Sequence, residues 1–356
     1  GELLESALEA ATQSEAESQR LRSRLSNHGE FQLLLRALEM RLQAANDAHS
    51  QAVVLAEVAQ VLDSAFGRSD EAFDRWLQAI RLIPESATFH ESALRLARRR
   101  RRLNEYVQAL RELATNMRRR QDSDLVASLL LRAGQVTETE LSDLDAASEF
   151  YRLVESTGHR VVEAWLALAR ISGSRGEHAE SIRFLERALG VEGLESEVRL
   201  EALYRLAELR MASREGLTRA VALLKQALEL RPQYDRAAQM LQPAVRLDPS
   251  NEELQSLYER VARATGNDTL IFDYLEQRTQ RDSTSIKELR EAVDYAMALG
   301  QEERSEGLLK RAFEVARKMP DGTHDVLWAL KNLADRREAA GDVRGAMVRL
   351  QQAIEL

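Results

Sequence analysis

Apolar residues recur along this chain at helical spacing, in paired segments joined by short polar turns. In residues 162–189 (VEAWLALARISGSRGEHAESIRFLERAL), the polar turn SRGEH separates two apolar segments. Apolar positions three and four residues apart predict amphipathic helices, so this stretch predicts two antiparallel helices. Residues 327–356 repeat the arrangement when Gly176 and Gly341 are aligned. The β-branched and aromatic runs typical of strands are absent, and we therefore expect an all-α protein.

Three further segments share this phase: residues 55–84, 200–232 and 289–312. Small residues keep fixed places in their second helices and in that of 162–189, namely Ala72, Ala79, Ala188, Ala220 and Ala227. Larger residues such as Trp76, Leu185 and Leu350 lie between the small positions. Small residues let two helices approach closely, and large ones fill the remaining gaps. One such pair cannot bury its apolar faces alone, so we expect the pairs to stack.

These positions resemble the tetratricopeptide repeat (TPR). Leu168-Ala169 and Leu333-Ala334 occupy the first helix of the motif, Gly176 and Gly341 its turn, and Pro84 closes a unit. The resemblance implies a right-handed α-solenoid of antiparallel helix pairs, and we expect seven to nine units. It also implies that the first helices line a concave groove.

The repeat pattern weakens at two places. Residues 90–114 lack a turn glycine and have RRLNEY instead. Residues 234–250 are too short for a pair, and Pro243 within them predicts a kinked or terminated helix. We therefore expect an N-terminal TPR-like array over 1–250 and a C-terminal array over 251–356, continuous with it, with a bend near 234–250.

Composition narrows the classes of partner and the location. The net charge of −8 and the pI of about 5.5 disfavour general attraction to nucleic acid or to anionic membranes. No apolar run is long enough to span a membrane. Arginine outnumbers lysine 45 to 5, which we interpret as the bias of a high-GC bacterial genome. The sequence starts at Gly1 without a signal-peptide pattern. We expect a cytoplasmic protein; a periplasmic location stays open because the native N-terminus is unknown.

Sequence motifs for catalysis are missing. The chain has neither G-x-x-x-x-G-K-[ST] nor G-x-G-x-x-G, so no phosphate loop is indicated. None of the six histidines lies one helical turn from another, as helical metal ligands would. We therefore expect no enzyme activity, no metal and no cofactor.

The first helix of each pair supplies the candidate groove residues that the resemblance implies. They are Arg170, Tyr204, Arg290, Trp328 and Lys331. Trp328 is the most informative, because an exposed tryptophan is a good binding hot spot; packing on the preceding helix is the alternative. The Lys, Asn and Arg set by which some TPR proteins hold a C-terminal carboxylate does not occur at these positions.

A run of five arginines ends the first helix of residues 90–114: Arg98, Arg99, Arg100, Arg101 and Arg102. Successive helical residues point about 100° apart, so the five cannot meet one phosphate strand. One interpretation is pairing with acidic residues of the same chain. The other is docking of an acidic segment of a partner protein, which a basic patch would attract.

The sequence thus predicts a non-catalytic protein–protein interaction scaffold. It would bind a partner protein or peptide segment through the concave groove, the arginine-rich patch, or both. The alternative is a structural array that self-associates through its uncapped ends, because residues 354–356 stop within a second helix with apolar positions exposed. A nucleic-acid-binding repeat is less favoured, since one basic cluster is not a regular basic stripe.

Overall fold

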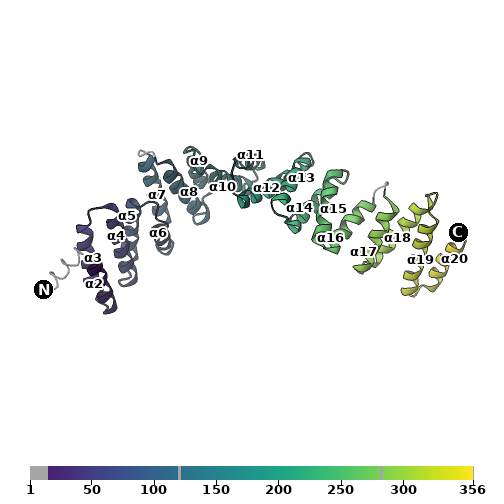
Figure 1. The fold of residues 1–356 in the computed structure, drawn as a ribbon, viewed down its shortest axis with the longest axis horizontal. Helices are drawn as coiled ribbons and strands as arrows, with labels where there is room; N and C mark the ends of the chain where they lie inside the picture. Colours follow the sequence, from purple (N-terminus) through teal and green to yellow (C-terminus); the bar gives the residue numbers. More distant parts are fainter. Residues whose placement is uncertain (1–14, 119–121, 281–283, 356) are drawn as a thin grey trace. The chain divides into compact units, whose positions relative to one another are not determined.

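Helices are the only regular elements in the described part of the chain. The computed structural model describes residues 15–118, 122–280 and 284–355. Contacts divide the chain into two compact units, Gly1–Val191 (unit 1) and Glu192–Leu356 (unit 2). Within each unit, consecutive helices lie side by side (Figure 1). The all-α prediction is confirmed. The expected boundary at residue 250 falls inside unit 2, and the bend near 234–250 stays a prediction.

Unit 1 contains ten described helices, each joined to the next by a short connection. They are α2 (Glu15–Asn27), α3 (Phe31–Ala44), α4 (Ala48–Ser64), α5 (Ser69–Leu82), α6 (Ala87–Arg100), α7 (Leu103–Arg118), α8 (Ser123–Thr139), α9 (Leu144–Glu155), α10 (Val161–Ser174) and α11 (His178–Leu189). Residues 1–14 lie outside the described part of the chain, which begins with α2.

Unit 2 contains nine described α-helices and one short 3₁₀ turn, Arg214–Gly216. The helices are α12 (Ser196–Met211), α13 (Leu217–Leu230), α14 (Tyr234–Leu247), α15 (Glu252–Thr265), α16 (Asp268–Thr279), α17 (Ile286–Ala298), α18 (Glu302–Arg317), α19 (Thr323–Ala339) and α20 (Val343–Ile354).

Nineteen described α-helices give nine pairs and one extra helix. We name the first helix of a pair the A helix and the second the B helix. The pairs are α2/α3, α4/α5, α6/α7, α8/α9, α10/α11, α12/α13, α15/α16, α17/α18 and α19/α20. The predicted number of units is therefore confirmed at its upper limit. Helix α14 is the extra one, as expected for a segment too short to form a pair. It runs through Pro243 to Leu247, so the proline does not end it.

The turn inside most pairs contains one residue with left-handed backbone geometry. Gly67 (φ 64°) and Gly176 (φ 77°) are examples, and a β-carbon at either position would meet nothing within 4 Å. Glycine is selected at these turns because it adopts positive φ without steric cost, and not because space is short. Polar side chains begin several helices. Asp47 Oδ1 accepts a hydrogen bond from the Ser50 amide at 2.8 Å, and Ser285 forms a capping box with Glu288.

The helices of a pair approach so closely that side chains reach the opposite backbone. In α10/α11 the Ser181 hydroxyl donates to the Ala169 carbonyl at 2.7 Å, across the crossing point of the two helices. Ser181, Ala169 and Ala188 are all fully buried. Ala72 and Ala79 are equally buried in α4/α5, where Trp76 lies between them with 2% of its surface exposed. The alternation of small and large residues is therefore confirmed as packing.

Gly134 in the middle of α8 offers a test of this packing. A β-carbon there would lie 2.8 Å from Tyr151 Cε1, and the Tyr151 hydroxyl is held by Glu138 at 2.8 Å. Glycine to alanine in a helix interior normally stabilises by up to about 1 kcal/mol. We expect Gly134→Ala instead to lower the free energy of unfolding by about 1–2 kcal/mol in urea titrations, because overpacking outweighs helix propensity.

The matched control is Gly307→Ala in α18, where a β-carbon would meet nothing within 4 Å. That change should raise the free energy of unfolding by up to about 1 kcal/mol. Equal stabilisation by both substitutions would contradict the packing argument.

Candidate functional site

Most of the arginine run has acidic partners within unit 1. Arg98 Nη2 lies 2.6 Å from Glu140 Oε1, and Arg100 Nη2 lies 2.5 Å from Asp70 Oδ2. Arg99 pairs with Asp63 and also donates to the Ser69 hydroxyl at 2.7 Å. These arginines are about half exposed, so the ion pairs add little to stability. The contacts favour pairing within the chain over docking of an acidic segment.

Arg102 is the most enclosed member of the run. Its guanidinium lies 2.6 Å from Glu105 and 2.8 Å from Asp74, and its Cζ stacks 4.5 Å from the centre of the Phe73 ring. Hydrogen bonding to Glu105 raises the pKa of Arg102. This side chain therefore joins α5 to α7 and is committed to the structure of unit 1.

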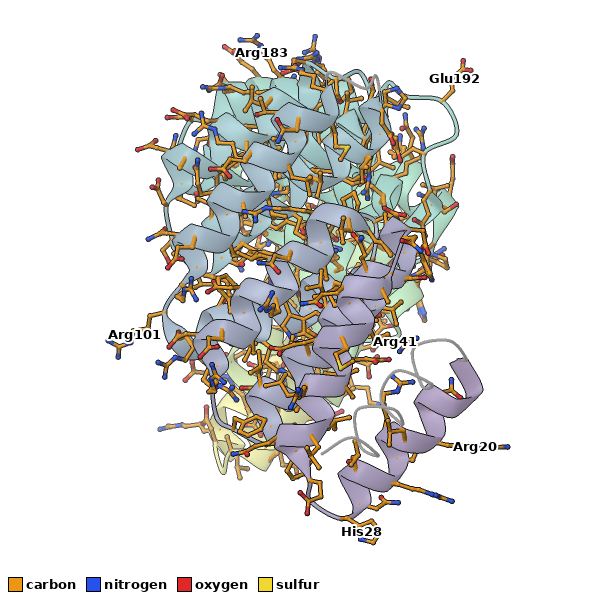
Figure 2. The ribbon with its side chains drawn as sticks, turned by 90° about the vertical axis from the view of Figure 1, so that its left-hand side faces the viewer. Arg20, His28, Arg41, Arg101, Arg183 and Glu192 are labelled. Carbon is orange, nitrogen blue, oxygen red and sulfur yellow. The ribbon has the colours of Figure 1, made fainter. Side chains whose placement is uncertain are left out.

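Arg101 is the exception in the run. It takes left-handed backbone geometry (φ 59°) at the end of α6, the place where α4 and α10 are followed by glycine. Its side chain points away from the ribbon (Figure 2), and no acidic partner lies within ion-pair distance among the described residues. A non-glycine residue in this conformation costs roughly 1–2 kcal/mol. Residues 90–114 therefore contain the same kind of turn as the other pairs, with arginine in the place of glycine.

A cavity of about 610 Å³ opens in unit 1 along the A helices of three consecutive pairs, α6, α8 and α10. Its lining is mostly polar. The residues are Pro84, Glu85, His90, Asp122, Asp124, Leu125, Ser128, Leu129, Leu131, Arg132, Gln135, Arg160 and Glu163. A concave site built from several elements, with a few polar groups converging on it, is the usual form of a binding site.

His90 forms the floor of this cavity and is only 2% exposed. Its Nδ1 lies 2.8 Å from the Tyr106 hydroxyl and its Nε2 lies 2.8 Å from the Pro84 carbonyl oxygen. Burial lowers the pKa of His90 to about 4, and the nearby positive charge of Arg132 adds to this effect. Burial also raises the pKa of Tyr106 to about 12. Both side chains are therefore neutral at pH 7 and hold the loop before α6.

Charged groups at the cavity rim are partly paired. Arg160 reaches Glu163 at 2.9 Å and donates to the Ser128 hydroxyl at 2.9 Å, which ties α10 to α8. Asp122 caps α8 by accepting from the Leu125 amide at 3.2 Å. Glu85 takes part in no ion pair among the described residues. The rim therefore offers both signs of charge beside apolar surface.

Two predicted groove residues are engaged elsewhere. Arg170 makes a double hydrogen bond to Glu138, with distances of 2.7 and 2.6 Å. Burial alone would raise the pKa of Glu138, but hydrogen bonds from Arg170 and Tyr151 hold it below its usual value. Tyr204 is fully buried and lies under the Arg236 guanidinium at 4.2 Å. Its placement on an open surface is thus corrected: the inserted turn residue in this pair shifted the alignment.

The other three predicted residues come together in unit 2. Arg290 of α17 places Nη2 2.6 Å from Asp325 Oδ1 and stacks its guanidinium 4.6 Å from the centre of the Trp328 ring. Lys331 follows Trp328 by one turn of α19 and is exposed. Trp328 is partly exposed, so it both packs on the neighbouring A helix and keeps accessible surface. Arg290 and Trp328 are thus in contact, and the role of these three residues in binding a partner stays a prediction.

The cavity residues His90 and Arg132 were not among the predicted site residues. Both lie on helices that contain several other polar residues, and the sequence pattern gives no sign that these two face the same space. Among the described residues no group of three or more His, Cys, Asp or Glu side chains could hold a metal ion. No described helix is both long enough and apolar enough to cross a membrane.

Comparison with known proteins finds similar solved structures but no similar sequence. No family model and no curated protein sequence matches this chain. Solved structures with a similar arrangement include a chain of the Naa15/Naa10 complex bound to HypK-THB, which is 17% identical, with 94% of this chain covered and a TM-score of 0.37. This chain spans 57% of that protein's length.

Two further solved structures match at comparable scores. A tetratricopeptide repeat protein from Parabacteroides merdae is 14% identical, with 75% of this chain and all of that chain covered and a TM-score of 0.31. Yeast Tom70 is 13% identical, with 97% and 85% covered and a TM-score of 0.30.

The buried histidine generates a pH-dependence prediction. In the unfolded chain a histidine takes up a proton near its ordinary pKa of 6.5, whereas folded His90 does so only near pH 4. Between these values the unfolded state binds more protons, so stability falls as the pH drops from about 6.5 toward 4. We expect this group to remove about 2 kcal/mol between pH 7 and pH 5 in urea titrations.

His90→Gln should show a correspondingly smaller loss over the same range. The control His178→Gln removes a histidine from an exposed helix start and should keep the loss of the parent chain. An unchanged loss in His90→Gln would show that other groups cause it.

Proposed function

We propose that this chain is a non-catalytic scaffold that binds a segment of a partner protein on its A-helix faces, with the cavity of unit 1 as its main site. One observation carries the proposal: three consecutive A helices, α6, α8 and α10, contribute to a single concave space of about 610 Å³. Such a space is large enough to take several side chains of a polypeptide segment. The TPR-like fold supports the proposal, because stacked helix pairs create extended binding surfaces.

The chemistry of the cavity fits a polypeptide better than a small metabolite. Its walls combine Leu125 and Leu129 with carboxylates, two arginines and the Ser128 hydroxyl. A peptide brings backbone carbonyl and amide groups as well as side chains of both signs, and it can satisfy such a mixed lining along its length.

Blocking the cavity tests this proposal. Gln135 is exposed and lines the space, so Gln135→Trp would fill it without disturbing the buried core. Peptides selected on the parent chain from a random displayed library should bind Gln135→Trp at least about tenfold more weakly, because the bulky ring occupies their place.

The matched control is Arg183→Trp on α11, an exposed position whose side chain points away from the ribbon (Figure 2). It should leave the affinities unchanged. Selected peptides that bind Gln135→Trp as tightly as they bind the parent would remove the cavity as the site.

Self-association through the C-terminal pair is a second candidate, favoured by the exposed face of α20. Met347 is 62% exposed and Ile354 is 84% exposed. In the same phase of the repeat, α5 has Phe73 and Ile80, which are 0% and 2% exposed because they are covered within unit 1. The α20 face therefore has the composition of a surface that another helix covers, and we propose a second copy of this chain as its occupant.

Sedimentation velocity over a range of concentrations tests the second candidate. The average mass of the parent chain should rise with concentration, and Met347→Glu should return it to that of a monomer, because a buried charge without a partner is costly. Leu247→Glu, at an exposed leucine of α14, is the control and should not change the mass. A monomeric parent at every concentration would exclude self-association.

A further inference from the structure

Four exposed apolar residues of α20 form one straight stripe along the helix, which we call the α20 stripe. They follow one another at intervals of four, three and four residues: Val343, Met347, Leu350 and Ile354. At about 100° per residue, all four point within about 60° of one another. Their exposed fractions lie between 46% and 84%. Alternating steps of three and four residues are the spacing by which two helices pack along their length.

Inside the array, the position of Leu350 is covered. Leu185 in α11 and Leu309 in α18 stand at the same distance from their turn glycines as Leu350 does from Gly341, and they are 1% and 0% exposed. Helix α18 is followed along the chain by α19, which packs on it. The natural occupant of the α20 stripe is therefore another helix with a stripe of the same kind, because each would remove the other's apolar surface from water.

Two exposed charges of opposite sign lie beside the stripe, one at each end. Arg344 follows Val343 and Glu355 follows Ile354, so the two charges are eleven residues apart and lie on the same flank of α20. Both are exposed, and neither forms an ion pair among the described residues. When two identical helices pack antiparallel about a two-fold axis, their equivalent flanks face each other and their opposite ends meet.

This charge arrangement selects the antiparallel orientation for two α20 helices. In that orientation Arg344 of each copy lies opposite Glu355 of the other, so both ends of the contact bring unlike charges together. A parallel orientation would place arginine opposite arginine and glutamate opposite glutamate, which is unfavourable. The α20 helix is thus complementary to itself in charge as well as in apolar surface.

We infer that two copies of this chain pair antiparallel through α20. Leu350 packs against Met347 of the other copy at the centre, and Val343 packs against Ile354 of the other copy at both ends. Because both copies use the same surface, the contact closes as a dimer and leaves no α20 stripe free to add a third copy. The inference rests on the second candidate of the proposed function, since it presumes that a second copy covers α20.

Introduced cysteines test the orientation, because the sequence has no cysteine of its own. In the antiparallel dimer, residue 343 of one copy lies about 16 Å from residue 343 of the other, too far for a disulfide. Val343→Cys alone and Ile354→Cys alone should therefore form little disulfide-linked dimer under mild oxidation. An equal mixture of the two variants should form it at least about tenfold faster, since the two positions then meet.

Charge reversal tests the flank. Arg344→Glu should weaken dimerisation about fivefold in sedimentation experiments, and the double variant Arg344→Glu/Glu355→Arg should restore most of that loss. Both changes place charges that favour the helix at its ends, so a weaker dimer would not result from loss of α20. Arg349→Glu is the matched control, because Arg349 lies on another side of α20, where it donates to Gln352 at 2.9 Å. It should leave dimerisation unchanged.

The outcomes separate this inference from the proposal on which it rests. A monomeric parent chain would remove both. A parent that self-associates and is returned to monomer by Met347→Glu, but gives no disulfide specific to the cysteine mixture, would sustain self-association and overturn the antiparallel pairing. Rapid linkage of Val343→Cys alone would indicate parallel helices, and a mass that rises beyond that of a dimer would indicate contact with a different surface; either result would also overturn it.

Discussion

The rest of this structure depends on how closely the two helices of each pair approach. The Ser181 hydroxyl reaches the Ala169 carbonyl at 2.7 Å, which is possible only where no large side chain stands between the helices. Alanine and serine are therefore required at the crossing points, and Ala72 and Ala79 meet this requirement in α4/α5 with no exposed surface. Larger residues then occupy the remaining space, and the turn must reverse the chain within a few residues.

Contacts between successive A helices follow from this arrangement. Arg170 on α10 reaches Glu138 on α8, and Arg290 on α17 reaches Asp325 on α19. Each pair is partly exposed, so its contribution to stability is small, about 0–1 kcal/mol. Its geometric effect is larger for Arg170, whose two hydrogen bonds to Glu138 hold α10 in register with α8. Many arginines of this chain are thus parts of the scaffold.

The repeat could be predicted from the sequence because helix packing requires small and large residues at regular intervals. Small residues, large residues and Gly176-type turns recur in phase, and the structure confirms them. The turn at Arg101 could not be predicted from the sequence, because the backbone takes left-handed geometry there although the residue is not glycine. Tyr204 was misplaced by one inserted turn residue, since a small shift along a helix moves a side chain from surface to core. The cavity could not be foreseen, because His90 and Arg132 meet only in space.

Charged side chains that lack an ion-pair partner indicate a binding surface better than a high local density of charged residues does. The five-arginine run is the most conspicuous feature of the sequence, yet its neighbours already supply carboxylates for Arg98, Arg99, Arg100 and Arg102. A partner would have to displace those carboxylates before it gained anything. Lys331 and Asp335 are inconspicuous in the sequence, but neither forms an ion pair in the described part of the chain. A segment that bound there would form its ion pairs without breaking others, whereas binding at the arginine run would break existing ones.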